Sequence, residues 1–187
     1  YGPSYNNDYF NENSNLNPTN PYSASKASVE MFINSYKLSF HLDVIILRCN
    51  NAYGIKQHPE KVIPSFINTS INNETLLIHG SGDQIRDFIH VKDISNAVML
   101  LINKGIYGEI YNIGNVNPIK IKDLASNIIK LVKSGNIKHI QDRPFNDNRY
   151  YVDCSKLKKL GWTIETNFEE EINEIIHWHK QNPNYWD

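Results

Sequence analysis

The chain has 187 residues, of which 40% are hydrophobic and 11% aromatic, and its formal net charge at pH 7 is -1. This length suits one domain or one lobe of a larger protein, and the balanced charge argues against nucleic-acid binding, which needs clustered Lys and Arg. No apolar run approaches the roughly 18–20 residues of a membrane span, and no signal-peptide pattern opens the chain. Cys49 and Cys154 stand alone without metal-binding spacing, which indicates a reducing compartment and predicts a cytoplasmic protein.

Helical and strand patterns alternate after an opening loop, residues 1–21, that is rich in Asn, Ser, Tyr and Pro. Apolar residues at three-to-four spacing predict helices, and short β-branched runs predict buried parallel strands. The predicted helices cover residues 23–40, 65–73, 93–103, 122–133 and the stretch after 167, and the predicted strands cover residues 43–49, 76–79, 87–91, 109–113 and 137–141. Such alternation predicts an α/β fold.

Three predicted helix ends carry capping residues. We expect Asp93 to be an N-cap and Gly135 to be a C-cap. Asn167 is expected to cap the last helix, with Glu170 as its capping-box partner. The buried stripe of that helix is predicted to consist of Phe168, Ile172, Ile175 and Ile176.

Tyr22 and Lys26 are the first candidates for chemistry. Their spacing of four places both side chains on one face of the predicted helix. A phenol is a poor base at neutral pH, but a neighbouring ammonium favours its ionised form. The pair is therefore a minimal device for removing a proton from a hydroxyl group. A chain with this many Tyr and Lys residues contains about one such spacing by chance, so an exposed helix face is the interpretation of this pair taken alone.

Other functional motifs are absent from the sequence. No GxGxxG or GxxGxxG turn is present to hold a pyrophosphate at a helix N-terminus, because Gly80 and Gly82 form only a GxG turn. The HExxH, GxSxG and GxxxxGK[ST] motifs are missing as well. His177 and His179 lie two positions apart, on different faces of a helix, so we expect no metal site.

Strings of residues along the whole chain resemble the extended short-chain dehydrogenases. Residues 21–27 (PYSASKA) are similar to the active-site helix of that family, and residues 48–54 (RCNNAYG) to its next strand and turn. The resemblance narrows to the nucleotide-sugar 4,6-dehydratases over residues 59–64 (PEKVIP), 82–88 (GDQIRDF), the turn at 91–93 (VKD) and residues 111–114 (YNIG).

This resemblance implies an NAD-binding Rossmann α/β fold with a smaller α/β substrate-binding lobe. The chain would be the carboxy-terminal part of that fold, without its amino-terminal βαβ half. Residues 1–56 would supply a late Rossmann helix and strand with the Tyr-xxx-Lys motif. Residues 57–187 would mainly form the sugar-nucleotide lobe, with 93–114 returning to the Rossmann sheet.

The resemblance also implies a role for individual residues. Tyr22 is expected to be the catalytic base, and Lys26 to bind the nicotinamide ribose; together with Ala52, both would contact the cofactor NAD. The nucleotide-sugar substrate is expected to contact Asn51, Lys61, Val62, Leu77, His79, Arg86, Ile121, Asp142, Arg143 and Asn146. An Arg side chain offers a planar donor fork that suits a diphosphate. From the residues alone, Arg86 and Arg143 could equally form surface ion pairs, and Asn51 could be a turn-forming residue.

Three further segments favour UDP-glucose over dTDP-glucose as the substrate. Residues 143–150 (RPFNDNRY), 157–162 (LKKLGW) and 181–186 (QNPNYW) are similar to the dehydratase part of UDP-rhamnose synthases. The dTDP-glucose dehydratases usually carry Gly-His in place of Phe145 and Asn146, and Asn in place of Ile121. The implied product is a 4-keto-6-deoxy sugar for the synthesis of rhamnose or a related deoxysugar.

The expected acid–base machinery is incomplete in this chain. In the family, an Asp and a Glu that eliminate water lie just before the Tyr-Gly matched by Tyr1 and Gly2. Because the first residue is Tyr1 rather than Met, we expect a fragment, a processed product or a trimmed form that is inactive alone, from a parent enzyme that is a homodimer. A stand-alone nucleotide-sugar-binding lobe without catalysis stays open as an alternative. A related C4 epimerase or decarboxylase is a third, against which residues 59–64 and 84–87 argue.

Overall fold

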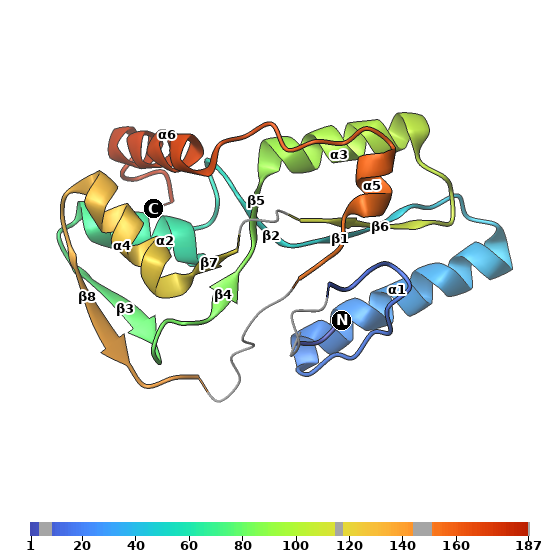
Figure 1. The fold of residues 1–187 in the computed structure, drawn as a ribbon, viewed down its shortest axis with the longest axis horizontal. Helices are drawn as coiled ribbons and strands as arrows, with labels where there is room; N and C mark the ends of the chain where they lie inside the picture. Colours follow the sequence, from blue (N-terminus) through green and yellow to red (C-terminus); the bar gives the residue numbers. More distant parts are fainter. Residues whose placement is uncertain (4–8, 115–117, 144–150, 187) are drawn as a thin grey trace.

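The computed structural model describes residues 1–3, 9–114, 118–143 and 151–186. Helices and strands alternate through these residues, which confirms the predicted α/β fold (Figure 1). The helices are α1 (Pro21–Phe40), α2 (Val62–Ile71), α3 (Val91–Lys104), α4 (Ile121–Val132), α5 (Ser155–Lys159) and α6 (Phe168–Gln181). The strands are β1 (Ile46–Cys49), β2 (Asn51–Tyr53), β3 (Thr75–His79), β4 (Ile85–Arg86), β5 (Phe88–His90), β6 (Ile110–Ile113), β7 (Ile119–Lys120) and β8 (Asn136–Ile140).

Parallel pairing joins strands that are distant in the sequence. The pairs β1–β6, β2–β5 and β3–β8 are parallel, and β4–β7 is antiparallel. Figure 1 shows α1 on one side of the β1–β6 pair and α3 on the other, while α2, α4 and α6 gather near β3 and β8. The β1–β6 register pairs Cys49 with Ile113, and the β2–β5 register pairs Asn51 with Phe88. These registers bring the carboxyl ends of β1 and β6 together beside β2.

Two hydrophobic clusters form the core. The larger cluster lies among α2, α4, α6 and the strands beside them, and includes Ile63, Ile67, Leu76, Ile128 and Ile175. The second cluster lies between α3 and the β1–β6 pair, and includes Ile89, Leu101, Tyr111, Ile113 and Trp162. Burial of apolar side chains on this scale is the main stabilising term for a domain of this size. The division of the chain at residue 56 stays a prediction.

The helix α1 begins two residues earlier than the sequence pattern predicts. Asn20 accepts a hydrogen bond from the Ser23 amide, and Ser23 Oγ accepts one from the Asn20 amide, so the two form a capping box. Pro21 suits the first turn because it has no amide hydrogen to satisfy. No side chain of α1 is buried, so this helix is held mainly by polar contacts such as that from Lys37 Nζ to the Gly108 carbonyl, at 3.0 Å.

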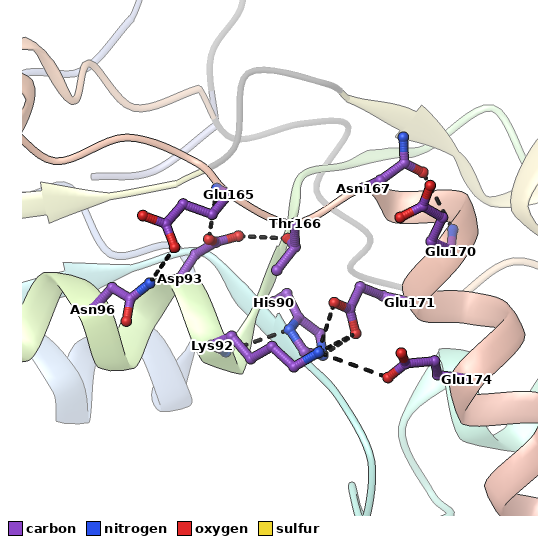
Figure 2. A network of polar contacts seen from close by, with 10 residues as sticks. All are labelled: His90, Lys92, Asp93, Asn96, Glu165, Thr166, Asn167, Glu170, Glu171 and Glu174. Atoms are coloured by element: carbon purple, nitrogen blue, oxygen red, sulfur yellow. Dashed lines mark hydrogen bonds and ion pairs between the residues drawn. The ribbon is translucent and has the colours of Figure 1, made fainter.

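The prediction that Asp93 caps α3 is wrong, and so is the prediction of a turn at residues 91–93. The helix starts at Val91, and His90 Nδ1 accepts from the Lys92 amide at 3.4 Å. The Asp93 carboxylate instead accepts from the Glu165 amide at 2.9 Å and from Thr166 Oγ1 at 2.5 Å (Figure 2). Asp93 therefore fastens the segment before α6 to the first turn of α3.

Two other predicted caps have different outcomes. Gly135 is not the C-cap of α4, because Lys133 takes that position in a left-handed conformation, with φ of 65°. Asn167 does cap α6, where its side chain accepts from the amides of Glu169 and Glu170. The predicted stripe of α6 is confirmed for Ile172, Ile175 and Ile176, which are buried, and for Phe168, which packs against them partly exposed.

The remaining differences concern short elements and helix ends. The helix α2 begins at Val62 rather than 65, because Pro64 fits within its first turn. The sequence pattern does not predict β2, β4, β7 or α5, because strands of two or three residues and a helix of five residues, little more than one turn, are too short to establish a period. Within the part of the chain that the structure describes, no helix has the length and apolar character that crossing a membrane requires.

Candidate functional site

A cleft of about 830 Å³ opens beside the ends of β1, β2, β3 and β4 and the first turns of α1, α2 and α4. It brings together most of the site residues predicted from the sequence. The predicted residues that line it are Tyr22, Asn51, Ala52, Lys61, Val62, Leu77, His79, Arg86, Ile121 and Arg143. Lys26 and Asp142 are not among the lining residues, and Asn146 lies outside the residues that the structure describes.

Tyr22 and Lys26 lie next to each other in the structure. The Nζ of Lys26 is 5.6 Å from the centroid of the Tyr22 ring, as expected for positions one helical turn apart. The capping box at Asn20 fixes Tyr22 in the first turn of α1, where its side chain is 72% exposed and borders the cleft. Lys26 is exposed one turn further along. Tyr22 thus presents a phenol to the cleft, and the Lys26 ammonium lies beside this phenol without lining the cavity.

Arg86 and Ile121 reach the cleft through one short ladder. The antiparallel β4–β7 pair places Arg86 opposite Ile119, and α4 begins two residues later at Ile121. The Arg86 guanidinium donates from Nη1 to the Ile85 carbonyl at 2.9 Å. Asn51 approaches from the other side on β2, which pairs with β5. Residues 35 positions or more apart in the sequence therefore border one cavity because of strand pairing.

Lys61 and Val62 lie at the N-terminus of α2, whose first amides have no side-chain cap. An uncapped helix N-terminus carries partial positive charge that favours an anion. Lys61 Nζ is 3.0 Å from Glu60 Oε1, and this ion pair holds the pKa of the Glu60 carboxyl below its usual value. Both side chains are exposed, so the ion pair is weak and the Lys61 ammonium is easily released to an anionic ligand.

Asp142 lies behind the cleft and holds one of its walls. Its Oδ2 accepts from Gln84 Nε2 at 3.3 Å, and its Oδ1 accepts from the Arg143 amide at 2.8 Å. Gln84 also donates to the His79 carbonyl at 3.3 Å, and Gln84 itself lines the cleft. Gly80 makes this approach possible, because a Cβ at that position would lie 2.6 Å from Asp142 Oδ2. Asp142 thus positions cleft residues and does not itself line the cavity.

The sequence analysis missed several residues that line the cleft or support it. The missed lining residues are Cys49, Asn50, Gln57, Glu60, Ile63, Ser65, Phe66, Ile78, Gln84 and Phe88. Asn50 is the most informative of them, because its Nδ2 donates to Asp87 Oδ2 at 2.9 Å. Burial raises the pKa of the Asp87 carboxyl to about 7. The strings 48–54 and 82–88 contain both residues, but no local pattern indicates that they meet.

The α/β fold agrees with what comparisons with known proteins find. The sequence profile described as GDP-mannose 4,6 dehydratase matches residues 1–175. The chain therefore belongs to this family, within the extended short-chain dehydrogenases.

The similar proteins include nucleotide-sugar 4,6-dehydratases and, among the solved structures, nucleotide-sugar 4-epimerases. A trifunctional UDP-glucose 4,6-dehydratase/UDP-4-keto-6-deoxy-D-glucose 3,5-epimerase/UDP-4-keto-L-rhamnose-reductase of Arabidopsis thaliana is 44% identical over 178 residues, which is 94% of this chain and 27% of the relative. A dTDP-D-glucose 4,6-dehydratase of Dictyostelium discoideum is 41% identical and is matched over 94% of this chain and 49% of its own length. The crystal structure of DesIV, a dTDP-glucose 4,6-dehydratase from Streptomyces venezuelae with NAD and TYD bound, has a TM-score of 0.94 at 31% identity and is matched over 99% of this chain and 58% of its own. The chain thus spans about half the length of the curated dTDP-glucose dehydratases that it matches.

Proposed function

We propose that this chain forms the sugar-nucleotide part of an NAD-dependent 4,6-dehydratase that converts UDP-glucose to its 4-keto-6-deoxy product. The observation that carries the proposal is the cleft itself. It gathers Asn51, Lys61, Arg86 and Arg143 from separate stretches of the chain, with Tyr22 at its border. Two guanidinium groups and an ammonium beside a helix N-terminus suit the diphosphate of a nucleotide sugar.

The preference for uridine over thymidine is a finer part of the proposal. Ile121, which stands where the thymidine enzymes usually carry Asn, lines the cleft. The relative that acts on UDP-glucose is 44% identical to this chain, against 41% for the dTDP-glucose dehydratase of Dictyostelium. Rhamnose or related deoxysugar synthesis is the pathway class that this substrate would serve.

The residues of this chain fit one end of the cofactor. Tyr22 and Ala52 line the cleft, and Lys26 lies one turn from Tyr22 on the same face of α1, so this group would hold the nicotinamide ribose. The only GxG turn, at Gly80 and Gly82, leads into β4 and not into a helix, so it offers no helix N-terminus to a pyrophosphate. When bound, NAD would supply hydride-transfer chemistry: the oxidised form would accept a hydride from C4 of the sugar, and the reduced form would donate it to C6.

Within this scheme the side chains of the chain move one proton. Tyr22 removes the proton of the sugar 4-hydroxyl, and the Lys26 ammonium lies 5.6 Å from the centroid of the Tyr22 ring. Elimination of water across C5 and C6 needs a further acid–base pair, and among the described lining residues of the cleft Glu60 is the one carboxylate and is paired with Lys61. The proposal therefore assigns binding and the first proton transfer to this chain, in a parent enzyme that is a cytoplasmic homodimer.

The direct test is calorimetric titration of the chain with UDP, with dTDP as the comparison. UDP is expected to bind more tightly than dTDP, and Arg86→Gln is expected to weaken UDP binding about tenfold by removing one charge-assisted contact. Lys130→Gln, an exposed substitution on α4 away from the cleft, should leave the affinity unchanged. Binding of neither nucleotide would contradict the proposal. The chain with UDP-glucose and NAD is expected to form no 4-keto-6-deoxyhexose, because the proposal assigns it only binding and the first proton transfer, and detection of that product would contradict this assignment.

A further inference from the structure

The last described residues fold back from α6 toward the loop that joins β2 to α2. The helix ends at Gln181, and the Tyr185 amide donates to the Asn182 carbonyl at 3.3 Å, which turns the chain. The two residues that follow this turn, Tyr185 and Trp186, are here called the C-terminal aromatic pair. Residues 55–61, between β2 and α2, are called the cleft loop.

A chain of ring contacts links α6 to the cleft loop. The Tyr185 ring lies 4.9 Å from the ring of Trp178 in α6 and 5.0 Å from that of Trp186, at interplanar angles of 75° and 86°. The Trp186 ring in turn lies 5.2 Å from the His58 ring at 63°. Lys56 Nζ is 5.8 Å from the centroid of the Tyr185 ring. Edge-to-face and cation–π geometries of this kind are attractive beyond simple burial.

The cleft loop has few other supports. None of the side chains of residues 55–61, all of them described, is buried. The backbone is held by hydrogen bonds from the Gln57 amide to the Gly54 carbonyl at 3.3 Å, from the Lys61 amide to the His58 carbonyl at 3.1 Å and from the Glu60 amide to His58 Nδ1 at 3.4 Å. Gln57 Nε2 also donates to the Ala52 carbonyl at 2.7 Å. With no apolar anchor in the core, the loop depends on these bonds and on the rings that cover it.

The same loop forms one wall of the cleft. Gln57, Glu60 and Lys61 line the cavity, and Lys61 is followed at once by the first turn of α2. His58 connects the two functions, because its ring contacts Trp186 while its carbonyl holds the Lys61 amide. His58 therefore links the Trp186 ring to the Lys61 backbone at the edge of the ligand site.

We propose that Tyr185 and Trp186 are positioning residues, which hold the cleft loop in the conformation that presents Gln57 and Lys61 to a nucleoside diphosphate. They act through His58 and Lys56 and do not themselves line the cleft. The identity of the ligand rests on the function proposed above, whereas the hold on the loop does not. Loss of the aromatic pair loosens the loop, so that binding must order it again and becomes weaker.

Hydrogen exchange of the Gln57 and Lys61 amides tests, without any ligand, whether the C-terminal aromatic pair keeps the cleft loop ordered. In Trp186→Ala these two amides should exchange about threefold to tenfold faster than in the wild type, the range that one aromatic pair supports. Trp186→Phe should restore the wild-type rates, because it keeps a ring against His58. His58→Ala, which breaks the same contact from the loop side, should reproduce the effect of Trp186→Ala. Tyr107→Ala, at an exposed ring far along the chain, is the matched control and should change neither rate.

Titration with UDP then tests the consequence for binding. Trp186→Ala should lower the affinity for UDP by about the same factor as it raises exchange, and Trp186→Phe should recover it. Unchanged exchange at both amides in Trp186→Ala and His58→Ala would overturn the proposal. A rise spread evenly over the whole chain would overturn it too, because it would mean a general loss of stability. If the wild type binds no UDP, the proposed function fails, and the exchange rates still decide whether the pair holds the loop.

Discussion

The Arg48 guanidinium and the Glu30 carboxylate form a two-pronged ion pair that joins β1 to α1. Nε donates to Oε1 at 2.9 Å and Nη2 donates to Oε2 at 2.6 Å, and the side chains are only 13% and 20% exposed. The Tyr1 hydroxyl accepts from Nη1 of the same guanidinium at 2.6 Å. Since α1 buries no side chain, this pair fixes the helix that carries Tyr22 and Lys26.

Glu30→Gln should lower the free energy of unfolding by about 2 kcal/mol, because it leaves a partly buried guanidinium without its counter-charge. Urea denaturation measures the change. Glu60→Gln makes the same substitution in the exposed pair with Lys61 and should leave the free energy of unfolding almost unchanged. Equal effects of the two substitutions would show that the Arg48 contact is no stronger than a surface pair.

Asp87→Asn should stabilise the protein at neutral and alkaline pH. Burial raises the pKa of the Asp87 carboxyl from its ordinary value of 3.8 to about 7, so the folded state holds the proton more tightly than the unfolded state. The free energy of unfolding therefore falls as the pH rises from about 4 to 7. The amide avoids this loss and can still accept from Asn50 Nδ2, so the variant should gain about 2 kcal/mol at pH 8 and nothing near pH 4.

Asp83 provides the opposite case for the same experiment. Hydrogen bonds from Lys122, Ser81 and Lys120 hold the pKa of its carboxyl well below the ordinary value. The Asp83 carboxylate therefore contributes to the free energy of unfolding above about pH 4, and this contribution is lost as the pH falls through the lowered pKa. Asp83→Asn should thus lower stability at pH 7 and lose its effect in acid. Parallel pH profiles for the two variants would contradict both assignments.

The buried imidazoles of His90 and His179 should make the protein less stable in mild acid. Burial lowers the pKa of each below the ordinary value of 6.5, so the unfolded state takes up protons that the folded state resists. By proton linkage, the neutral imidazoles leave the free energy of unfolding undiminished above about pH 6.5. The free energy of unfolding falls as the pH drops below this value, because the unfolded state binds more protons. His90 Nε2 lies 3.3 Å from Glu171 Oε2 (Figure 2). The negative charge of Glu171 raises the pKa of His90, but by less than burial lowers it.

Thermal denaturation from pH 7 to pH 5 checks this prediction. His90→Asn keeps an oxygen that can accept the Lys92 amide at the start of α3 but has no titrating ring. The variant should lose stability less steeply with falling pH than the wild type, and the His90→Asn/His179→Asn double variant less steeply still. An unchanged slope in the double variant would mean that other groups control the acid transition.

Asp93→Ala should be among the most damaging single substitutions in the chain. Asp93 is 1% exposed, and its carboxylate satisfies both the Glu165 amide and the Thr166 hydroxyl. Removing it leaves two donors unpaired, which should cost about 3 kcal/mol. Asn96→Ala removes one exposed hydrogen bond to Glu165 from the next turn of α3 and should cost less than about 1 kcal/mol. Chemical denaturation of the two variants compares them directly.

The sequence predicts the long elements and half of the residues that line the cleft, because both depend on local strings. Periodicity identifies α1, α3, α4 and α6, and the strings around Tyr22, Asn51 and Arg86 identify the residues that meet in the cavity. It does not predict contacts between distant side chains. Asp142 and Gln84 are 58 positions apart, and Asp93 and Thr166 are 73 apart, so no spacing rule connects them. Asp93 is misassigned for this reason, because its true partners lie beyond the reach of a capping pattern.

Because α1 has no buried side chain, it is expected to unfold locally before the core of the molecule does. A helix that is tied down by a few polar contacts opens at a lower free energy than elements packed into a core. A protease added at low concentration would therefore cut within α1 first and leave the core around α2, α4 and α6 intact. The side of the cleft that carries Tyr22 is thus cleaved by the protease first, while the wall formed by α2 and β3 stays folded for longer.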